Sequence, residues 1–177
     1  MENAAASVMT KARLSSVLAG LVVLATLVAL GLVLWLQFAR GEPPCSLCVY
    51  QRLADLAVLI IVLMGFFWTG GTRRGLWLLA ALYALAGAGL AGWQWHLTTV
   101  SVMQTESCAA VQIFTPDRAL GNFGKDFAST LSGSGSCALA GAHTLAGWPI
   151  THWSVAFFSG CAILLIIAQK MLAPRKS

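Results

Sequence analysis

The stretch Pro43-Pro44-Cys45-Ser46-Leu47-Cys48-Val49-Tyr50-Gln51-Arg52 lies where one long apolar run of the chain ends and the next begins. Cys45 and Cys48 are three residues apart, so their sulfur atoms come within bonding reach across a single turn of helix. A helix N-terminus and a nearby positive charge both favour a thiolate, and the start of the second run and Arg52 provide these two features. The stretch therefore predicts a redox-active dithiol at a membrane surface.

The composition places the chain in a membrane. Of its 177 residues, 58% are hydrophobic and only 10% are charged, which is far from the composition of a soluble domain. The net charge of +5 raises nucleic-acid binding as an alternative. However, the basic residues stand in short clusters between apolar runs, which is typical of membrane topology signals and not of a phosphate-binding surface. We therefore expect an integral membrane protein.

Four apolar runs are each about 20 residues long, which is enough to span the hydrocarbon core of a bilayer. The first run is longer than the apolar part of a cleaved signal peptide, and no small-x-small cleavage site follows it, so we interpret it as a retained helix. A glycine-rich turn is expected over residues 69–75, and small residues around Gly87 are expected to form a helix–helix contact. The sequence predicts an all-α membrane protein of one domain (1–177), a four-helix bundle with spans at 14–36, 49–68, 76–95 and 150–169 and loops at 37–48 and 97–149.

Lysine and arginine residues are divided unequally between the two sides of this bundle, and the richer side is expected to be cytoplasmic. Both termini are then cytoplasmic, and the cysteines outside the apolar cores lie on the other side, where disulfides persist. The richer side holds Lys11, Arg13, Arg73, Arg74, Lys170, Arg175 and Lys176, and the other side holds Arg40, Arg52, Arg118 and Lys125.

The residues alone leave three interpretations of Cys45 and Cys48, namely a structural bridge, half of a metal site or a redox pair. A structural disulfide usually joins distant segments, whereas this one closes a very small loop and constrains little. Zinc needs four convergent ligands, usually as two close pairs, and the remaining loop cysteines, Cys108 and Cys137, are far apart in sequence. We favour the redox pair and expect no metal.

Cys108 and Cys137 lie in the long hydrophilic segment, and in isolation they would be interpreted as an ordinary loop disulfide. Beside a membrane-surface dithiol they fit a relay, because thiol–disulfide exchange passes oxidising equivalents from one pair to another through mixed disulfides. The tract over 132–136, Ser-Gly-Ser-Gly-Ser, has the composition of a flexible linker and would let Cys137 move between partners.

The chain shows no flavin or dinucleotide motif, so a lipid-soluble quinone is the expected electron acceptor. Arg52 could stabilise a thiolate at Cys48 and polarise a quinone carbonyl, or it could only reach the headgroups or pair with Asp55. His96 ends the third span, either as an interfacial polar residue or near a quinone head group. Cys161 lies inside the fourth span and is expected to be a small buried hydrophobe.

Four spans, the motif Cys-x-Leu-Cys-x-Tyr-Gln-Arg at the start of the second span and a second cysteine pair between spans three and four resemble the DsbB family. The resemblance covers residues 14–170. It implies a protein of the bacterial inner membrane that reoxidises the periplasmic thioredoxin-like protein DsbA and passes the electrons to ubiquinone, or to menaquinone under anaerobic conditions.

The resemblance also implies a role for each loop cysteine. Cys108 would form the mixed disulfide with DsbA, and Cys137 would be its partner. Cys45 would exchange with Cys137, and Cys48 would face the quinone beside Arg52. His96 matches a quinone-proximal position only loosely.

Other functions remain as alternatives at this point. A paralogue dedicated to a single substrate, such as a sulfotransferase-specific oxidase, would share the same motif. An enzyme like vitamin K epoxide reductase also combines four helices with two cysteine pairs, but its membrane pair belongs to a late helix. A non-catalytic scaffold with a structural loop disulfide predicts that Cys45→Ser leaves function intact, and a metal-binding membrane sensor predicts stoichiometric zinc.

Overall fold

The computed structural model of the protein describes residues 2–40, 45–99 and 144–172. Four long helices account for most of this part of the chain, and each contains a segment long and apolar enough to cross a membrane. The predicted all-α membrane bundle is therefore confirmed. The helices are α1 (Glu2–Arg40), α2 (Ser46–Phe67), α3 (Gly70–Thr99) and α6 (Ile150–Met171).

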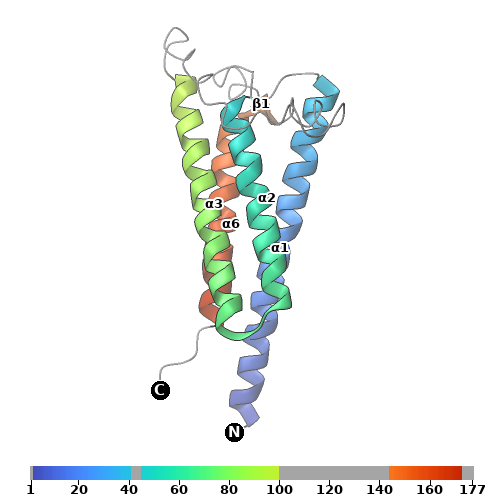
Figure 1. Ribbon diagram of the computed structural model, residues 1–177, viewed down its shortest axis with the longest axis vertical. Helices are drawn as coiled ribbons and strands as arrows, with labels where there is room; N and C mark the ends of the chain where they lie inside the picture. Colours follow the sequence, from blue (N-terminus) through green and yellow to red (C-terminus); the bar gives the residue numbers. More distant parts are fainter. Residues whose placement is uncertain (1, 41–44, 100–143, 173–177) are drawn as a thin grey trace, which may run out of the picture.

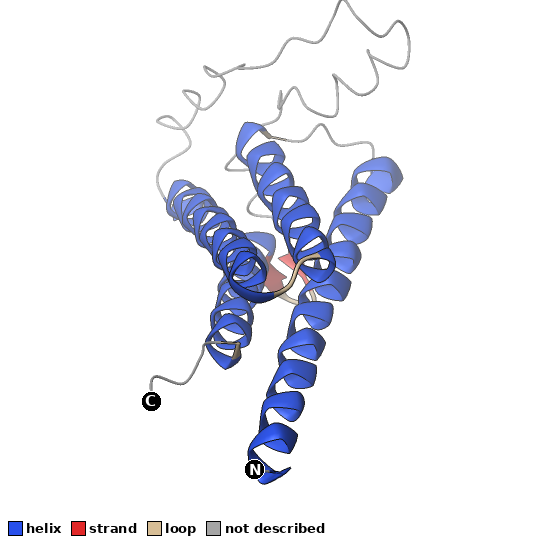
Figure 2. Ribbon diagram, turned by 60° about the horizontal axis from the view of Figure 1, so that its bottom comes forward, coloured by secondary structure: helices blue, strands red, loops and turns tan. Residues whose placement is uncertain are grey.

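The four helices lie side by side and alternate in direction (Figure 1). The start of α1, the connection between α2 and α3, and the end of α6 share one end of the bundle, and α1 extends beyond its neighbours there (Figures 1 and 2). The start of α2, with Cys45 and Cys48, lies at the opposite end, which we call the cysteine end. The predicted basic residues that the structure describes, in α1, at the start of α3 and in the last turn of α6, therefore belong to the end away from the cysteines.

Two helices extend well beyond the predicted spans. Helix α1 continues from Glu2 to Arg40 because the polar start of the chain is rich in alanine and holds no proline or glycine. The predicted turn over residues 69–75 is wrong, since only Trp68 and Thr69 separate α2 from α3. Gly70, with φ of 67°, completes the reversal, and the following residues satisfy their backbone groups in helix α3.

The core lies where the four helices meet. Helix α3 packs against α2 and α6, and α1 closes the ring through contacts with the same two helices. Large apolar side chains on the outer faces remain exposed, as expected for surfaces that meet lipid. The core itself comprises Ala19, Val22, Val58, Val62, Trp77, Ala80, Ala81, Ala84, Cys161, Ala162, Leu165 and Ala168.

The small residues of α3 form a close helix–helix contact, as predicted. Gly87 is buried against α6, and a Cβ atom built on it would lie 2.6 Å from two ring atoms of Phe158. No real Cβ contact is that short, so the ring occupies space that only glycine leaves open. Ala84 and Ala91 lie one turn away on the same face and are fully buried. This face carries Gln94 one further turn toward the cysteine end.

Before α6 the chain forms a short hairpin that was not predicted. Strand β1 (Thr144–Leu145) pairs antiparallel with β2 (Trp148–Pro149). The turn residues Ala146 and Gly147 have φ values of 53° and 81°, the left-handed conformation that tight hairpin turns require. The indole Nε1 of Trp153 donates a hydrogen bond of 3.0 Å to the Leu145 carbonyl and so fastens the hairpin to the first turn of α6.

Candidate functional site

Cys45 and Cys48 form a disulfide at the N-terminus of α2. Cys45 caps the helix, because its backbone is extended and its carbonyl accepts the first helical hydrogen bond from Val49 N at 3.1 Å. Its Sγ also accepts from the backbone N–H of Cys48 at 3.2 Å, in the way that a polar capping side chain does. The helix start thus fixes the pair, with Cys45 fully buried and Cys48 half-buried.

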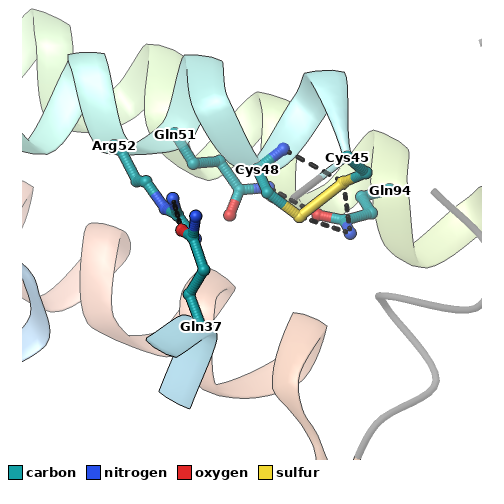
Figure 3. Close-up of a disulfide and its surroundings, with 6 residues drawn as sticks. All are labelled: Gln37, Cys45, Cys48, Gln51, Arg52 and Gln94. Atoms are coloured by element: carbon teal, nitrogen blue, oxygen red, sulfur yellow. Dashed lines mark hydrogen bonds between the residues drawn. A yellow bond between two sulfur atoms is a disulfide. The ribbon is translucent and has the colours of Figure 1, made fainter. Parts of the chain in front are cut away.

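A chain of two amides from neighbouring helices ends on this disulfide (Figure 3). Gln51, on α2, donates from Nε2 to Gln94 Oε1, on α3, at 2.8 Å. Gln94 Nε2 lies 3.6 Å from Cys45 Sγ and 3.5 Å from Cys48 Sγ. Both glutamines are buried, with 9% of Gln51 and 3% of Gln94 exposed, so the interaction takes place out of bulk water.

Arg52 is directed toward α1 (Figure 3). Its guanidinium donates to Gln37 Oε1. The proposed pairing of Arg52 with Asp55 is not formed: Asp55 is 4% exposed, and within the described residues its Oδ1 has no hydrogen-bond partner. The two residues are i and i+3, but the amide of Gln37 draws the guanidinium to the neighbouring helix. Arg52 therefore connects α2 to α1 by a hydrogen bond, one helical turn after Cys48.

His96 and Cys161 take no part in the contacts around the disulfide. His96 is exposed, and its ring lies beside that of Trp93, with the ring centroids 5.8 Å apart and the ring planes tilted by 41°. It follows Gln94 by two residues, which places it about 200° around the helix from the sulfur-facing side. Its role in quinone binding stays a prediction. Cys161 is a buried free cysteine in the core, as expected. Cys108 and Cys137 lie outside the described residues.

The two glutamines are the site residues that the sequence analysis missed. Gln51 was quoted only as part of a motif, and Gln94 had no assigned role. They are 43 residues apart, and no spacing rule brings them together. The available signal was an amide inside an apolar span on the same face as small packing residues, because a polar group buried in a bundle requires a partner.

The chain matches the family profile described as "Disulfide bond formation protein DsbB" over residues 15–168. It is 34% identical to disulfide bond formation protein B of Herminiimonas arsenicoxydans over 145 residues, which cover 82% of this chain and 89% of the relative. The protein of the same name from Acinetobacter baylyi is 32% identical over 156 residues, or 86% and 88% of the two chains. No solved structure matches significantly. The profile covers nearly all of the bundle, and the chain therefore belongs to the DsbB family of disulfide bond formation proteins, which are quinone-linked thiol oxidoreductases.

Proposed function

We propose that Cys45 and Cys48 are the pair from which this oxidoreductase passes electrons to membrane quinone, and that Cys108 and Cys137 exchange with the protein partner. The observation that carries the proposal is the Cys45–Cys48 disulfide, capped by the helix N-terminus and contacted by a buried amide. A dithiol at a helix start is suited to thiolate chemistry, because the N–H groups there stabilise negative charge. The partner is a periplasmic DsbA-like thioredoxin-fold protein, and the acceptor is ubiquinone, with menaquinone as the alternative.

The exchange step follows from the chemistry of disulfides. A thiolate of an incoming dithiol attacks Cys45 Sγ, a new sulfur–sulfur bond forms, and the Cys45–Cys48 bond breaks with its electron pair leaving on Cys48 Sγ. The second thiolate of the dithiol then attacks the mixed disulfide and releases Cys45. The incoming pair is oxidised by two electrons and the Cys45–Cys48 pair is reduced by two. Cys137 with Cys108 is the proposed incoming pair, by family role.

The residues at the cysteine end fit a quinone head group. Arg52 Nε is a buried donor with no hydrogen-bond partner among the described residues. The hydroxyl of Thr151, in the first turn of α6, is also buried and also has no such partner there. Quinone carbonyls accept hydrogen bonds, so Arg52 is the proposed residue that would hold one of them. Membrane quinone would accept the two electrons of the reduced pair, and the Cys45–Cys48 disulfide would be restored.

The cysteine end is proposed to face the periplasm. The basic residues in the first part of α1, at Arg73 and Arg74, and in the last turn of α6 belong to the opposite end of the bundle (Figure 1), and such residues favour the cytoplasm. The chain would then lie in the bacterial inner membrane with both termini cytoplasmic. Labelling of cysteines introduced singly at Ser177 and Ser46 with a membrane-impermeant maleimide tests this, since Ser46→Cys alone should react in intact spheroplasts.

The cysteine assignment is tested by trapping. A DsbA-like partner that retains only its attacking cysteine is mixed with the purified chain and separated on a non-reducing gel. We expect a covalent adduct, located at Cys108 by mass spectrometry and absent for Cys108→Ser. An adduct on Cys45 or Cys48, or an unchanged yield with Cys108→Ser, would overturn the assignment of the two pairs.

A further inference from the structure

Opening the Cys45–Cys48 disulfide places negative charge in a buried site. The disulfide itself is neutral, whereas every exchange step leaves a thiolate on one of its sulfurs. Cys45 is 0% exposed, and the amides beside the pair are almost as deeply buried. A charge in such surroundings is costly unless hydrogen-bond donors meet it. The donors that reach each sulfur therefore bear directly on the chemistry.

Within the described residues, two N–H groups donate to these sulfurs. The backbone N–H of Cys48 is directed at Cys45 Sγ, and the side-chain amide of Gln94 reaches both sulfurs (Figure 3). The guanidinium of Arg52 is bonded to Gln37 instead. Among the described residues, Gln94 Nε2 is therefore the one group that donates a hydrogen bond to Cys48 Sγ.

The orientation of the Gln94 amide is controlled by the other glutamine. Gln51 Nε2 donates to Gln94 Oε1, so the oxygen of that amide is engaged and its NH₂ group faces the sulfurs. The oxygen would repel a thiolate, whereas the NH₂ group attracts it. A hydrogen bond to an ionised acceptor is about twice as strong as one to a neutral acceptor, so the interaction strengthens as the disulfide opens.

We propose that Gln94 is a catalytic hydrogen-bond donor that stabilises the thiolate released on Cys48, and that Gln51 is the positioning residue that directs it. The inference rests on the proposed function of the Cys45–Cys48 pair. In the step concerned, the thiolate of an incoming dithiol bonds to Cys45 Sγ, the Cys45–Cys48 bond breaks, and its electron pair remains on Cys48 Sγ facing Gln94 Nε2. When both cysteines are reduced, the same donor favours the dithiol over the disulfide and so makes the pair a stronger oxidant.

The test is the redox equilibrium of the pair against glutathione, which requires neither quinone nor protein partner. The full chain carries Cys108→Ser and Cys137→Ser, so that Cys45 and Cys48 are the reporting pair, and the reduced fraction is measured by thiol trapping and mass spectrometry. For Gln94→Leu we expect the equilibrium constant for reduction to fall about tenfold to a hundredfold, the value of a hydrogen bond to a charged group. Gln94→His, which keeps an N–H donor, should recover part of the loss.

The matched control is Gln169→Leu, which removes an amide near the far end of α6, away from the sulfurs. It should leave the equilibrium within twofold of the parent. Gln51→Met keeps Gln94 but removes the group that directs it, and should shift the equilibrium in the same direction by a smaller factor. An equilibrium within twofold of the parent for Gln94→Leu in monodisperse protein would overturn the proposal. If Gln94→Leu fails to fold, Gln51→Met decides, and no shift there overturns it.

This result is separable from the proposed function. If the purified chain transfers no electrons to quinone yet Gln94→Leu shifts the glutathione equilibrium, the quinone assignment fails and the donor role stands. If quinone reduction proceeds and the equilibrium is insensitive to Gln94 and Gln51, the donor role fails and the proposed function stands.

Discussion

The contact between Gly87 and Phe158 makes a quantitative prediction about how α3 is held against α6. A methyl group added at Gly87 would lie 2.6, 2.6 and 2.9 Å from three ring atoms of Phe158, whereas ordinary van der Waals contact begins near 3.4 Å. The ring is 3% exposed and packs edge-to-face on Phe157 at 5.1 Å, so it has little room to move. Such overpacking costs about 1–3 kcal/mol.

Gly87→Ala also gains helix propensity, by up to about 1 kcal/mol. The control Gly89→Ala, on the same helix with nothing within 4 Å of its built Cβ, makes the same gain without the clash. The difference between the two variants therefore isolates the clash, and we expect Gly87→Ala to be less stable than Gly89→Ala by about 1–3 kcal/mol. Because Gln94 lies on the same face, the change should also weaken its contact with the sulfurs.

The assay is unfolding of both variants in mixed micelles of increasing denaturing detergent, followed by circular dichroism and tryptophan fluorescence. The double variant with Gly87→Ala and Phe158→Leu should regain part of the loss, because the smaller side chain vacates the space that the methyl group enters. Equal stability of Gly87→Ala and Gly89→Ala would refute the close approach of α3 and α6.

Three further predictions concern buried polar and aromatic groups. Asp55→Leu should stabilise the bundle by about 1–3 kcal/mol in the same unfolding assay, because it removes a buried oxygen without a hydrogen-bond partner in the described structure. A clear loss of stability would instead show that the carboxyl is paired. Gln37→Leu should lower the stability of the bundle by about 1.5–3 kcal/mol, because the Arg52 guanidinium loses its hydrogen bond to α1. An unchanged midpoint of unfolding would contradict that hydrogen bond. Trp77→Ala should cost about 3–5 kcal/mol, because the ring is fully buried beneath Arg73; a cost below about 1 kcal/mol would contradict this packing.

The number and placement of the helices could be predicted from the sequence because they depend on local properties. Apolar runs of membrane-spanning length gave four spans, and the prolines before Cys45 marked the boundary between α1 and α2. The helix ends were less accurate. At Gly70 a single glycine completes the turn, and glycines 71 and 75 are helical because the surrounding helix satisfies their backbone groups. Composition alone suggested a longer turn.

The candidate site divides in the same way. Cys45 and Cys48 were recognised because a spacing of three residues within one helical turn is a local pattern. The contact of Gln94 with their sulfurs depends on the register between α2 and α3, where the ring of Trp77 packs closely against Gly65. The destination of the Arg52 guanidinium likewise depends on which side chain of α1 lies opposite it. Register between helices is not encoded in the periodicity of either helix.

The central claim, that electrons pass through the Cys45–Cys48 pair to quinone, is tested most directly by quinone reduction. The purified full chain is given a reduced thioredoxin-like partner and ubiquinone or menaquinone, and the rate is compared for wild type, Cys48→Ala and the buried-cysteine control Cys161→Ala. The account predicts turnover by wild type and Cys161→Ala and none by Cys48→Ala. Turnover by Cys48→Ala at the wild-type rate, or no reduction of either quinone by wild type, would contradict it.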